Sequence, residues 1–301
     1  MRSEFPKIFA GVLALTTVLY FFLFDAGTRV RTFFAKGTGQ IRLFNHFPPP
    51  DEPHKTVHVD TDRPVVVIGD IHGCFDEFEE LLVKIKDEIY GGRPMEHSTF
   101  QLFLVGDLVN KGPKSAEVVK KVRAMVESGS THVVRGNHEE ALLEEWSTTN
   151  ALTRRSKYSY ISKLNSDDRL FLLQLPYTIS VPKLEWMIVH AGLDPQKSLE
   201  HQEPDYMVRM RNFNDNKPTH LIEKGEKWVI KWEKEGEFRV IFGHDARRRL
   251  QQGNNYLGLD TGVVYGDRLT ALVRLPNGNE KFISVPAKKA YEEVKGVMYH
   301  R

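Results

Sequence analysis

The chain of 301 residues is poor in cysteine, in net charge and in long apolar runs. Its only thiol belongs to Cys74, and one thiol cannot pair within the chain, so a disulfide-stabilised scaffold is excluded. The 42 Lys and Arg residues nearly balance the 40 Asp and Glu residues. This balance predicts no general attraction to nucleic acid, and we expect no DNA partner. Because only one long apolar run exists, a polytopic membrane protein is excluded as well.

The single apolar run is Ile8–Phe24, which carries no charged side chain. A helix of about 17 residues spans roughly 26 Å, close to the hydrocarbon thickness of a thin bilayer, about 27 Å. The run ends without the small residues of a signal-peptidase site. The sequence therefore predicts an uncleaved single-pass transmembrane helix and a membrane localisation. A cleaved signal peptide and a buried core helix are the alternatives. A small excess of basic residues after the run favours a cytosolic C-terminus.

Polarity divides the chain into four segments. Residues 1–28 are the predicted membrane anchor, and residues 29–62 are interpreted as a linker that the prolines at 48–50 stiffen. Residues 63–285 alternate short apolar runs with helical periodicity, which predicts an α/β domain. Residues 286–301 are rich in Lys and Glu and are predicted to form a C-terminal tail.

Five short apolar runs in the α/β segment predict buried strands, at 64–68, 100–105, 131–134, 186–189 and 238–242. Helical spacing follows the first two strands, and Ser115 is the predicted cap of the second helix. A short polar motif follows each strand: Gly69–Gly73, Gly106–Gly112, Arg135–Glu139, His190–Gly192 and Gly243–Asp245. Open α/β sheets place ligands beyond the carboxyl ends of their strands, so we expect the five motifs to form one site.

The side chains in these motifs have the chemistry of metal ligands. Asp70 and His72 stand two residues apart in a turn bounded by glycines, so both can reach one cation. The two carboxylate oxygens of Asp107 can bridge two cations. An amide oxygen and two imidazoles complete the set, from Asn137, His190 and His244. Mixed nitrogen and oxygen ligands suit Mn, Fe, Zn or Co, whereas the lack of a thiolate argues against a structural zinc site of the cysteine type.

Together the motifs resemble those of the metallophosphoesterases in the phosphoprotein phosphatase (calcineurin-like) superfamily. The resemblance covers residues 63–285. Within that superfamily, several stretches are similar to those of the ApaH-like phosphatases, relatives of bacterial diadenosine tetraphosphatase. These stretches are Asn110–Ser115, Met210–Asn212, Gly243–Ala246 and Gly258–Gly262. The resemblance implies an α-β-β-α sandwich, in which two facing sheets lie between layers of helices.

The resemblance also implies roles for the matching residues. It implies two divalent transition metal ions (Zn, Mn, Co or Fe), the first held by Asp70, His72 and Asp107, the second by Asp107, Asn137, His190 and His244. His138 would be the general acid, and Arg135 would bind a phosphate oxygen. Three further residues would help to bind substrate phosphate: Asn110, Lys111 and Arg211.

The chain departs from the protein phosphatases of the superfamily at Asn110-Lys111, where those enzymes carry Asp-Arg. Asn cannot stabilise a protonated catalytic histidine as Asp does, and Lys offers phosphate a point charge in place of a fork of donors. This departure favours the ApaH-like branch over a serine/threonine phosphatase.

The implied reaction is hydrolysis of a phosphoanhydride bond by attack of a metal-activated hydroxide. ApaH-like relatives with an N-terminal anchor resemble the fungal vacuolar endopolyphosphatase. The main expectation is therefore an endopolyphosphatase at the vacuole membrane, with polyphosphate as its partner and its C-terminal domain in the lumen. In this expectation the resemblance outweighs the small excess of basic residues after the apolar run, which favours the opposite orientation. The alternatives are a hydrolase of dinucleoside polyphosphates or RNA caps, a serine/threonine protein phosphatase and, from another class, a non-catalytic membrane scaffold. A nucleotide requires an aromatic stacking surface beside the metals, whereas polyphosphate requires only cations.

Overall fold

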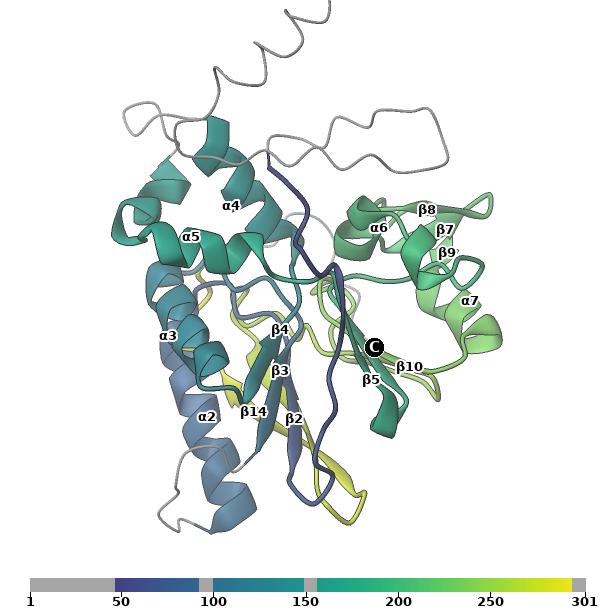
Figure 1. Ribbon diagram of the computed structural model, residues 1–301, viewed down its shortest axis with the longest axis horizontal. Helices are drawn as coiled ribbons and strands as arrows, with labels where there is room; N and C mark the ends of the chain where they lie inside the picture. Colours follow the sequence, from purple (N-terminus) through teal and green to yellow (C-terminus); the bar gives the residue numbers. More distant parts are fainter. Residues whose placement is uncertain (1–46, 92–99, 149–155, 294–301) are drawn as a thin grey trace, which may run out of the picture. The chain divides into compact units, whose positions relative to one another are not determined.

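The computed structural model describes residues 47–91, 100–148 and 156–293. They belong to one folded unit, Asn45–Arg301 (Figure 1). A second unit, Met1–Phe44, lies outside the described ranges, and the predicted transmembrane run Ile8–Phe24 is part of it. Within the described ranges, no helix combines the length and the apolar character needed to cross a membrane.

Five strands form the first sheet, in the order β14-β13-β2-β3-β4. Its parallel strands are β2 (Val65–Ile68), β3 (Gln101–Leu104) and β4 (Thr131–Val133). β13 (Arg268–Arg274) runs antiparallel to β2, and β14 (Glu280–Pro286) runs antiparallel to β13. The three parallel strands are the first three of the five predicted strands.

Six strands form the second sheet, in the order β1-β5-β6-β10-β12-β11. Their bounds are His54–Thr56 for β1, Thr178–Val181 for β5, Trp186–Val189 for β6, Arg239–Phe242 for β10, Tyr256–Gly258 for β12 and Gln251–Gln252 for β11. β10 runs parallel to both β6 and β12, whereas β5 runs antiparallel to β6. β6 and β10 are the other two predicted strands.

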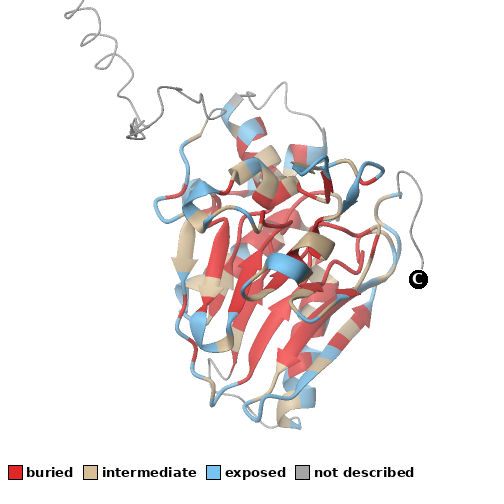
Figure 2. Ribbon diagram, turned by 90° about the vertical axis from the view of Figure 1, so that its right-hand side faces the viewer, coloured by how far each residue is buried: buried red, intermediate tan, exposed pale blue. Residues whose placement is uncertain are grey.

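The two sheets pack face to face, and the alternation along β2 shows how. Val65 and Val67 point between the sheets, where they join Ile188 of the other sheet. Val66 and Ile68 point the opposite way and pack beneath helices. All four β2 residues are fully buried, as expected for a strand that is covered on both faces. Figure 2 shows the buried strands in the middle of the unit and exposed residues on its outer elements.

Helices cover the outer faces of both sheets (Figure 1). The five-stranded sheet carries α2 (Phe75–Tyr90), α3 (Ser115–Glu127), α4 (Asn137–Thr148), α5 (Ser166–Leu173) and the 3₁₀ helix η1 (Ser156–Lys163). The six-stranded sheet carries α6 (Pro204–Arg209) and α7 (Trp228–Glu235). Beside these lies a small sheet of β7 (Asn212–Asn214), β8 (Lys217–Thr219) and β9 (Glu226–Lys227). Two short 3₁₀ turns are η2 (Pro182–Leu184) and η3 (Leu199–His201). This order of layers is the α-β-β-α sandwich that the resemblance implied.

Ser115 does not cap α3 as predicted, because it is the first residue of the helix. Its hydroxyl instead accepts a hydrogen bond from the backbone N–H of Asn110 at 2.9 Å. The Ser115 hydroxyl therefore binds the preceding loop and does not cap the N-terminus of α3. This contact ties α3 to the loop that carries Asp107.

Two predicted segment boundaries fall inside the folded unit. β1 lies within the range expected to be a linker, and it pairs with β5. At the other end, the range expected to be a tail is bonded to the domain, because Ala287 N donates to Asp267 O at 2.7 Å and Tyr291 N donates to Val264 O at 2.9 Å. β1 is an edge strand, and both segments are held by backbone hydrogen bonds, which polarity along the chain does not reveal.

Candidate metal centre

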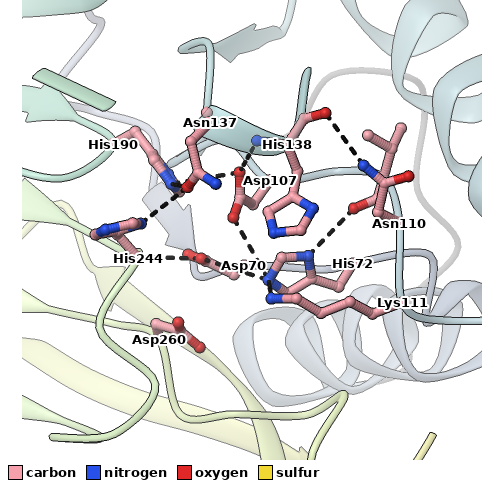
Figure 3. Close-up of polar contacts among 12 residues, drawn as sticks. Asp70, His72, Asp107, Asn110, Lys111, Asn137, His138, His190, His244 and Asp260 are labelled. Carbon is pink, nitrogen blue, oxygen red and sulfur yellow. Dashed lines mark hydrogen bonds and ion pairs between the residues drawn. The ribbon is translucent and has the colours of Figure 1, made fainter. Parts of the chain in front are cut away.

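Side chains from all five polar motifs lie close together (Figure 3). Each motif begins within two residues of the end of its strand, which is β2, β3, β4, β6 or β10. The first three strands belong to one sheet and the last two to the other. The site is therefore built across the two sheets, and both must pack correctly before the ligands come together.

Four predicted ligands of the second metal surround a common point. The Nε2 atom of His190 lies 3.3 Å from Asp107 Oδ1 and 3.1 Å from Asn137 Oδ1. The Nδ1 atom of His244 lies 2.9 Å from the same amide oxygen of Asn137. One possible metal group therefore consists of Asp107, His190 and His244, all of them buried, with the oxygen of Asn137 beside it.

Hydrogen bonds fix which nitrogen of each histidine faces this point. His190 Nδ1 donates to Val105 O at 2.7 Å, and His244 Nε2 donates to Arg209 O at 3.1 Å. In neutral imidazole the other nitrogen is then an acceptor. Two imidazole acceptors, an amide oxygen and a carboxylate oxygen thus face one another. A cation satisfies all four, so the side chains fit a divalent metal in both type and orientation.

The first predicted metal group has a similar arrangement. His72 Nδ1 lies 3.2 Å from the carbonyl oxygen of Val109, so Nε2 faces the cluster. That Nε2 lies 3.5 Å from Asp107 Oδ2 and 4.0 Å from Asp70 Oδ2. Asp70 Oδ1 is buried without a hydrogen-bond partner among the described residues, as expected for an oxygen reserved for a cation.

Two other side chains reach the first group. The ammonium of Lys111 lies 2.9 Å from His72 Nε2, the nitrogen that would bind the metal. The ring of His138 packs edge-on against that of His72, with 4.7 Å between the ring centroids. One ligand atom from each of His72, Asp107 and His138 also lies within 4.8 Å of the other two, so the three can share a cation. His138 thus lies close enough to act on a group bound at the first metal.

The backbone at the site is strained. Five non-glycine residues there have positive φ: His72 at 49°, Asp107 at 51°, Asn110 and Lys111 at 68° and His244 at 68°. Such conformations cost about 1–3 kcal/mol each and persist only where the surroundings enforce them. Clustering of this strain at the ligands is typical of a functional site.

A residue without a predicted role, Glu139, holds the loops together. Its buried carboxylate accepts hydrogen bonds from the backbone N–H groups of Asp107 at 2.8 Å, Leu108 at 2.8 Å, Val109 at 3.3 Å and Gly136 at 2.9 Å. These four donors come from the loops after β3 and β4. Glu139 therefore sets the position of Asp107 relative to Asn137. Its place two residues after Asn137 was the only signal in the sequence.

Burial and neighbouring charge separate the pKa values of the acidic groups. Burial, and then the charges of Asp260 and Asp107, raise the pKa of Asp70 well above its usual range. Burial alone would also raise the pKa of Asp107, but His190 and His138 hold it well below that range. Asp107 is thus the permanent negative charge of the centre. Burial lowers the pKa of His138 to about 4, so its imidazole is neutral at pH 7.

A pocket of about 430 Å³ opens beside the cluster. It shares four residues with the metal groups: Asp107, Asn137, His138 and His244. Its other walls include Lys111, Arg211, Arg247, Leu221, Ile222 and Tyr265. The Tyr265 ring lies 5.2 Å from the Lys111 ammonium. Cationic, apolar and aromatic side chains therefore stand side by side next to the proposed metals.

The predicted phosphate-binding residues have different positions. Lys111 and Arg211 line the pocket, but Asn110 does not. Asn110 is buried, accepts a hydrogen bond from the Tyr160 hydroxyl at 2.7 Å and donates to the backbone oxygen of His138 at 3.2 Å. It therefore positions the His138 backbone, and Tyr160 in turn orients Asn110.

Arg135 does not reach the pocket. Its side chain is fully buried, and its guanidinium donates to Leu173 O at 2.5 Å and to the Tyr177 hydroxyl at 3.3 Å. The ring of Tyr177 lies 5.2 Å from the guanidinium carbon. These contacts hold both terminal nitrogens of the guanidinium within the protein, although its Nε has no hydrogen-bond partner among the described residues. A phosphate contact by Arg135 remains a prediction that the observed placement does not support.

Residues 63–268 match the family model for calcineurin-like phosphoesterases. The match covers more than half of the chain, and the chain therefore belongs to this family of metal-dependent phosphoesterases, as the motifs predicted.

Curated relatives narrow the comparison. The asymmetrical bis(5'-nucleosyl)-tetraphosphatase PrpE of Bacillus subtilis is 29% identical over 245 residues, which is 75% of this chain and 96% of that protein. PrpE of Halalkalibacterium halodurans is 28% identical over 241 residues, 74% of this chain and 94% of that protein. The symmetrical bis(5'-nucleosyl)-tetraphosphatase of Thioalkalivibrio sulfidiphilus is 26% identical over 268 residues, 70% and 94% of the two chains.

A solved structure supports the same branch. The crystal structure of a protein described as a candidate diadenosine tetraphosphatase has a TM-score of 0.64 and 34% sequence identity, over 78% of this chain and 98% of that chain. The predicted ApaH-like branch is thereby confirmed. The further resemblance to an endopolyphosphatase remains a prediction.

Proposed function

We propose that this phosphoesterase hydrolyses dinucleoside polyphosphates, cleaving a phosphoanhydride bond at the metal centre. The observation that carries the proposal is the composition of the pocket beside the ligands. Tyr265, Leu221 and Ile222 line the same pocket as Lys111 and Arg211. A base can stack on an aromatic ring and pack on apolar side chains, whereas inorganic polyphosphate needs only cations. The relatives named as dinucleoside tetraphosphatases support the same substrate class.

The chain's own residues supply several parts of the reaction. Divalent ions held by the ligand set would supply an activated water and stabilise charge on phosphate oxygens. Lys111 and Arg211 offer charged N–H donors to the phosphates. His138, whose backbone Asn110 holds at 3.2 Å, is the proposed proton donor to the leaving oxygen. Because burial lowers its pKa to about 4, His138 is neutral at pH 7, and it would take up the proton released by the attacking water before passing a proton to the leaving oxygen.

The other functions expected from the sequence have less support. Polyphosphate cleavage, the main expectation, would leave the aromatic and apolar walls without a role. A protein phosphatase is disfavoured by Asn110, which contacts the His138 backbone and not its ring. The buried Nδ1 of His138 has no hydrogen-bond partner among the described residues. The complete ligand set argues against a non-catalytic scaffold.

A substrate panel tests the proposal. The full chain is assayed with diadenosine tetraphosphate, long-chain polyphosphate, a phosphoserine peptide and p-nitrophenyl phosphate, with Mn, Zn, Co and Mg supplied separately. We expect the highest kcat/KM on the dinucleotide with at least one transition metal. A higher kcat/KM on polyphosphate, with loss of mean chain length before free phosphate appears, would replace this function by the endopolyphosphatase.

We also propose that Ile8–Phe24 anchors the protein in a membrane with the catalytic unit on the lumenal side, as in a vacuole. The support is the uncharged apolar run itself and the resemblance to anchored relatives. A C-terminal tag on intact membrane vesicles should resist added protease and become sensitive after detergent. Digestion of the tag on intact vesicles would place the catalytic unit on the cytosolic side. Recovery of the protein in the soluble fraction would show that Ile8–Phe24 does not anchor it in a membrane.

A further inference from the structure

The segment after β14 is built into the wall of the pocket. Glu77 of α2 is fully buried, and its Oε1 accepts from Lys288 N at 2.9 Å and from the Tyr291 hydroxyl at 2.8 Å. The backbone N–H groups of Tyr291 and Glu292 both donate to Val264 O, at 2.9 and 3.1 Å. The segment is thus fastened to α2 on one side and to the loop before β13 on the other.

This fastening brings two carboxylates, Glu292 and Glu293, to the pocket. A β-bridge joins Ala290 to Tyr265, so the acidic pair begins two residues after the residue that pairs with the aromatic wall. In the described part of the chain no hydrogen bond or ion pair engages the side-chain oxygens of Glu292 or Glu293. The third glutamate of the pocket, Glu223, differs because Arg247 pairs with it at 3.2 Å.

Unpaired carboxylates are a poor lining for a pocket that takes a chain of phosphates, because like charges repel. They are good acceptors for paired hydroxyl donors, such as those of a ribose. The cation stands nearer the ligands, since the Lys111 ammonium is 2.9 Å from His72 Nε2 and 5.2 Å from the Tyr265 ring. Lys111 therefore lies beside the ligands with the Tyr265 ring next to it, and Glu292 and Glu293 line the same pocket.

We infer that Tyr265, Glu292 and Glu293 form a nucleoside subsite, which takes the nucleoside of a nucleoside polyphosphate whose phosphates lie at Lys111 and the ligand set. The base packs against Tyr265, and the carboxylates accept hydrogen bonds from the ribose hydroxyls. The same carboxylates disfavour an uncapped polyphosphate in this position. The inference rests on the proposed function and adds the residues that select a nucleotide over inorganic polyphosphate.

The test is a double variant of the full chain, Glu292→Gln with Glu293→Gln, assayed with Mn on diadenosine tetraphosphate and on inorganic tripolyphosphate. Hydrogen bonds to charged acceptors contribute enough that KM for the dinucleotide should rise roughly tenfold or more. KM for tripolyphosphate should fall by about twofold or more, because two negative charges leave the wall. The decrease in kcat/KM for the dinucleotide should come mainly from the higher KM and not from a lower kcat.

The control is Glu80→Gln, which removes one charge from an exposed position of α2; it should change neither KM. A second variant, Tyr265→Leu, should weaken binding of the dinucleotide more than binding of tripolyphosphate, while Tyr265→Phe retains dinucleotide binding. Urea unfolding confirms that each variant folds.

The outcomes separate the two claims. Opposite shifts of the two KM values support the subsite. Unchanged or equally raised KM values in the double variant, with a wild type that cleaves the dinucleotide, overturn the subsite and leave the proposed function intact. A wild type that cleaves tripolyphosphate but not the dinucleotide overturns the proposed function, and the subsite falls with it.

Discussion

Replacing Gly136 by Ala should disable the metal centre while the protein stays folded. A methyl group at this position would overlap Asp107 Oδ1 and the Asp107 backbone nitrogen, and would lie 2.9 Å from Glu139 Oε2. The loop cannot move aside easily, because the Glu139 carboxylate holds it through four backbone N–H groups. The Asp107 carboxylate must therefore turn away from His190, which lies 3.3 Å from it in the native protein.

The size of the effect follows from two changes around Asp107. Overpacking costs about 1–3 kcal/mol, and breaking the 2.9 Å hydrogen bond from His138 N to Asp107 Oδ1 adds roughly 1.5 kcal/mol. We expect the free energy of unfolding of the chelator-treated protein to fall by about 2.5–4.5 kcal/mol. Misorientation of the ligands should lower metal affinity by about 10- to 100-fold.

Two measurements check this. Urea unfolding in chelator gives the change in stability. A titration with Mn or Zn that is monitored by calorimetry gives the metal affinity. The control is Gly129→Ala, whose new methyl group meets no atom within 4 Å but sits at a φ of 87°. It should lose stability through backbone strain, roughly 1–2 kcal/mol, and keep wild-type metal affinity. If Gly136→Ala binds both metals as tightly as the wild type, the packing of Gly136 against Asp107 does not determine the orientation of the ligands at the metal centre.

Four further predictions follow from the same structure. Asp107→Asn should reduce the metal content from about two ions per chain and abolish hydrolysis, because Asp107 contributes to both groups; elemental analysis and an assay would show it, and full activity of the variant would defeat the binuclear reading. His138→Asn should slow turnover on poor leaving groups far more than on activated aryl phosphates, which need no protonation; equal losses would make the role of His138 structural. Burial, and then the charge of Lys55, lower the pKa of His132 to about 4, so between about pH 6.5 and pH 4 the unfolded chain binds a proton that the folded chain does not. Stability should therefore fall as the pH drops through that window, by about 1–2 kcal/mol more than in His132→Gln, allowing for the partial exposure of the ring; parallel urea curves in chelator at pH 7 and pH 4.5 would test this. Burial also raises the pKa of the Cys74 thiol, so at neutral pH a thiol reagent should label the native protein slowly and the urea-unfolded protein fast; rapid native labelling would contradict the buried position.

The sequence alone was sufficient for the five strands that carry the polar motifs and for the nature of the site. Runs such as Val65–Ile68 are apolar and β-branched over a strand's length, which is a local property of the chain. The motif after each run carries carboxylate, amide and imidazole groups whose chemistry does not depend on the rest of the fold. Because parallel strands present their carboxyl ends together, Asp70, His72 and Asp107 could be expected at one edge.

Only the tertiary structure decided which polar residues face the pocket. Arg135 stands next to the ligand loop in the chain, yet Leu173 and Tyr177, which follow it at a distance, bind its guanidinium inside the protein. Glu292 lies far from every motif, yet Glu77 and Val264 fasten its segment to the pocket wall. Side-chain identity and spacing determine what a residue can bind. The partners that come from distant segments determine whether a buried charge is already satisfied or left for a ligand, and these partners are brought together only when the two sheets and their helices pack.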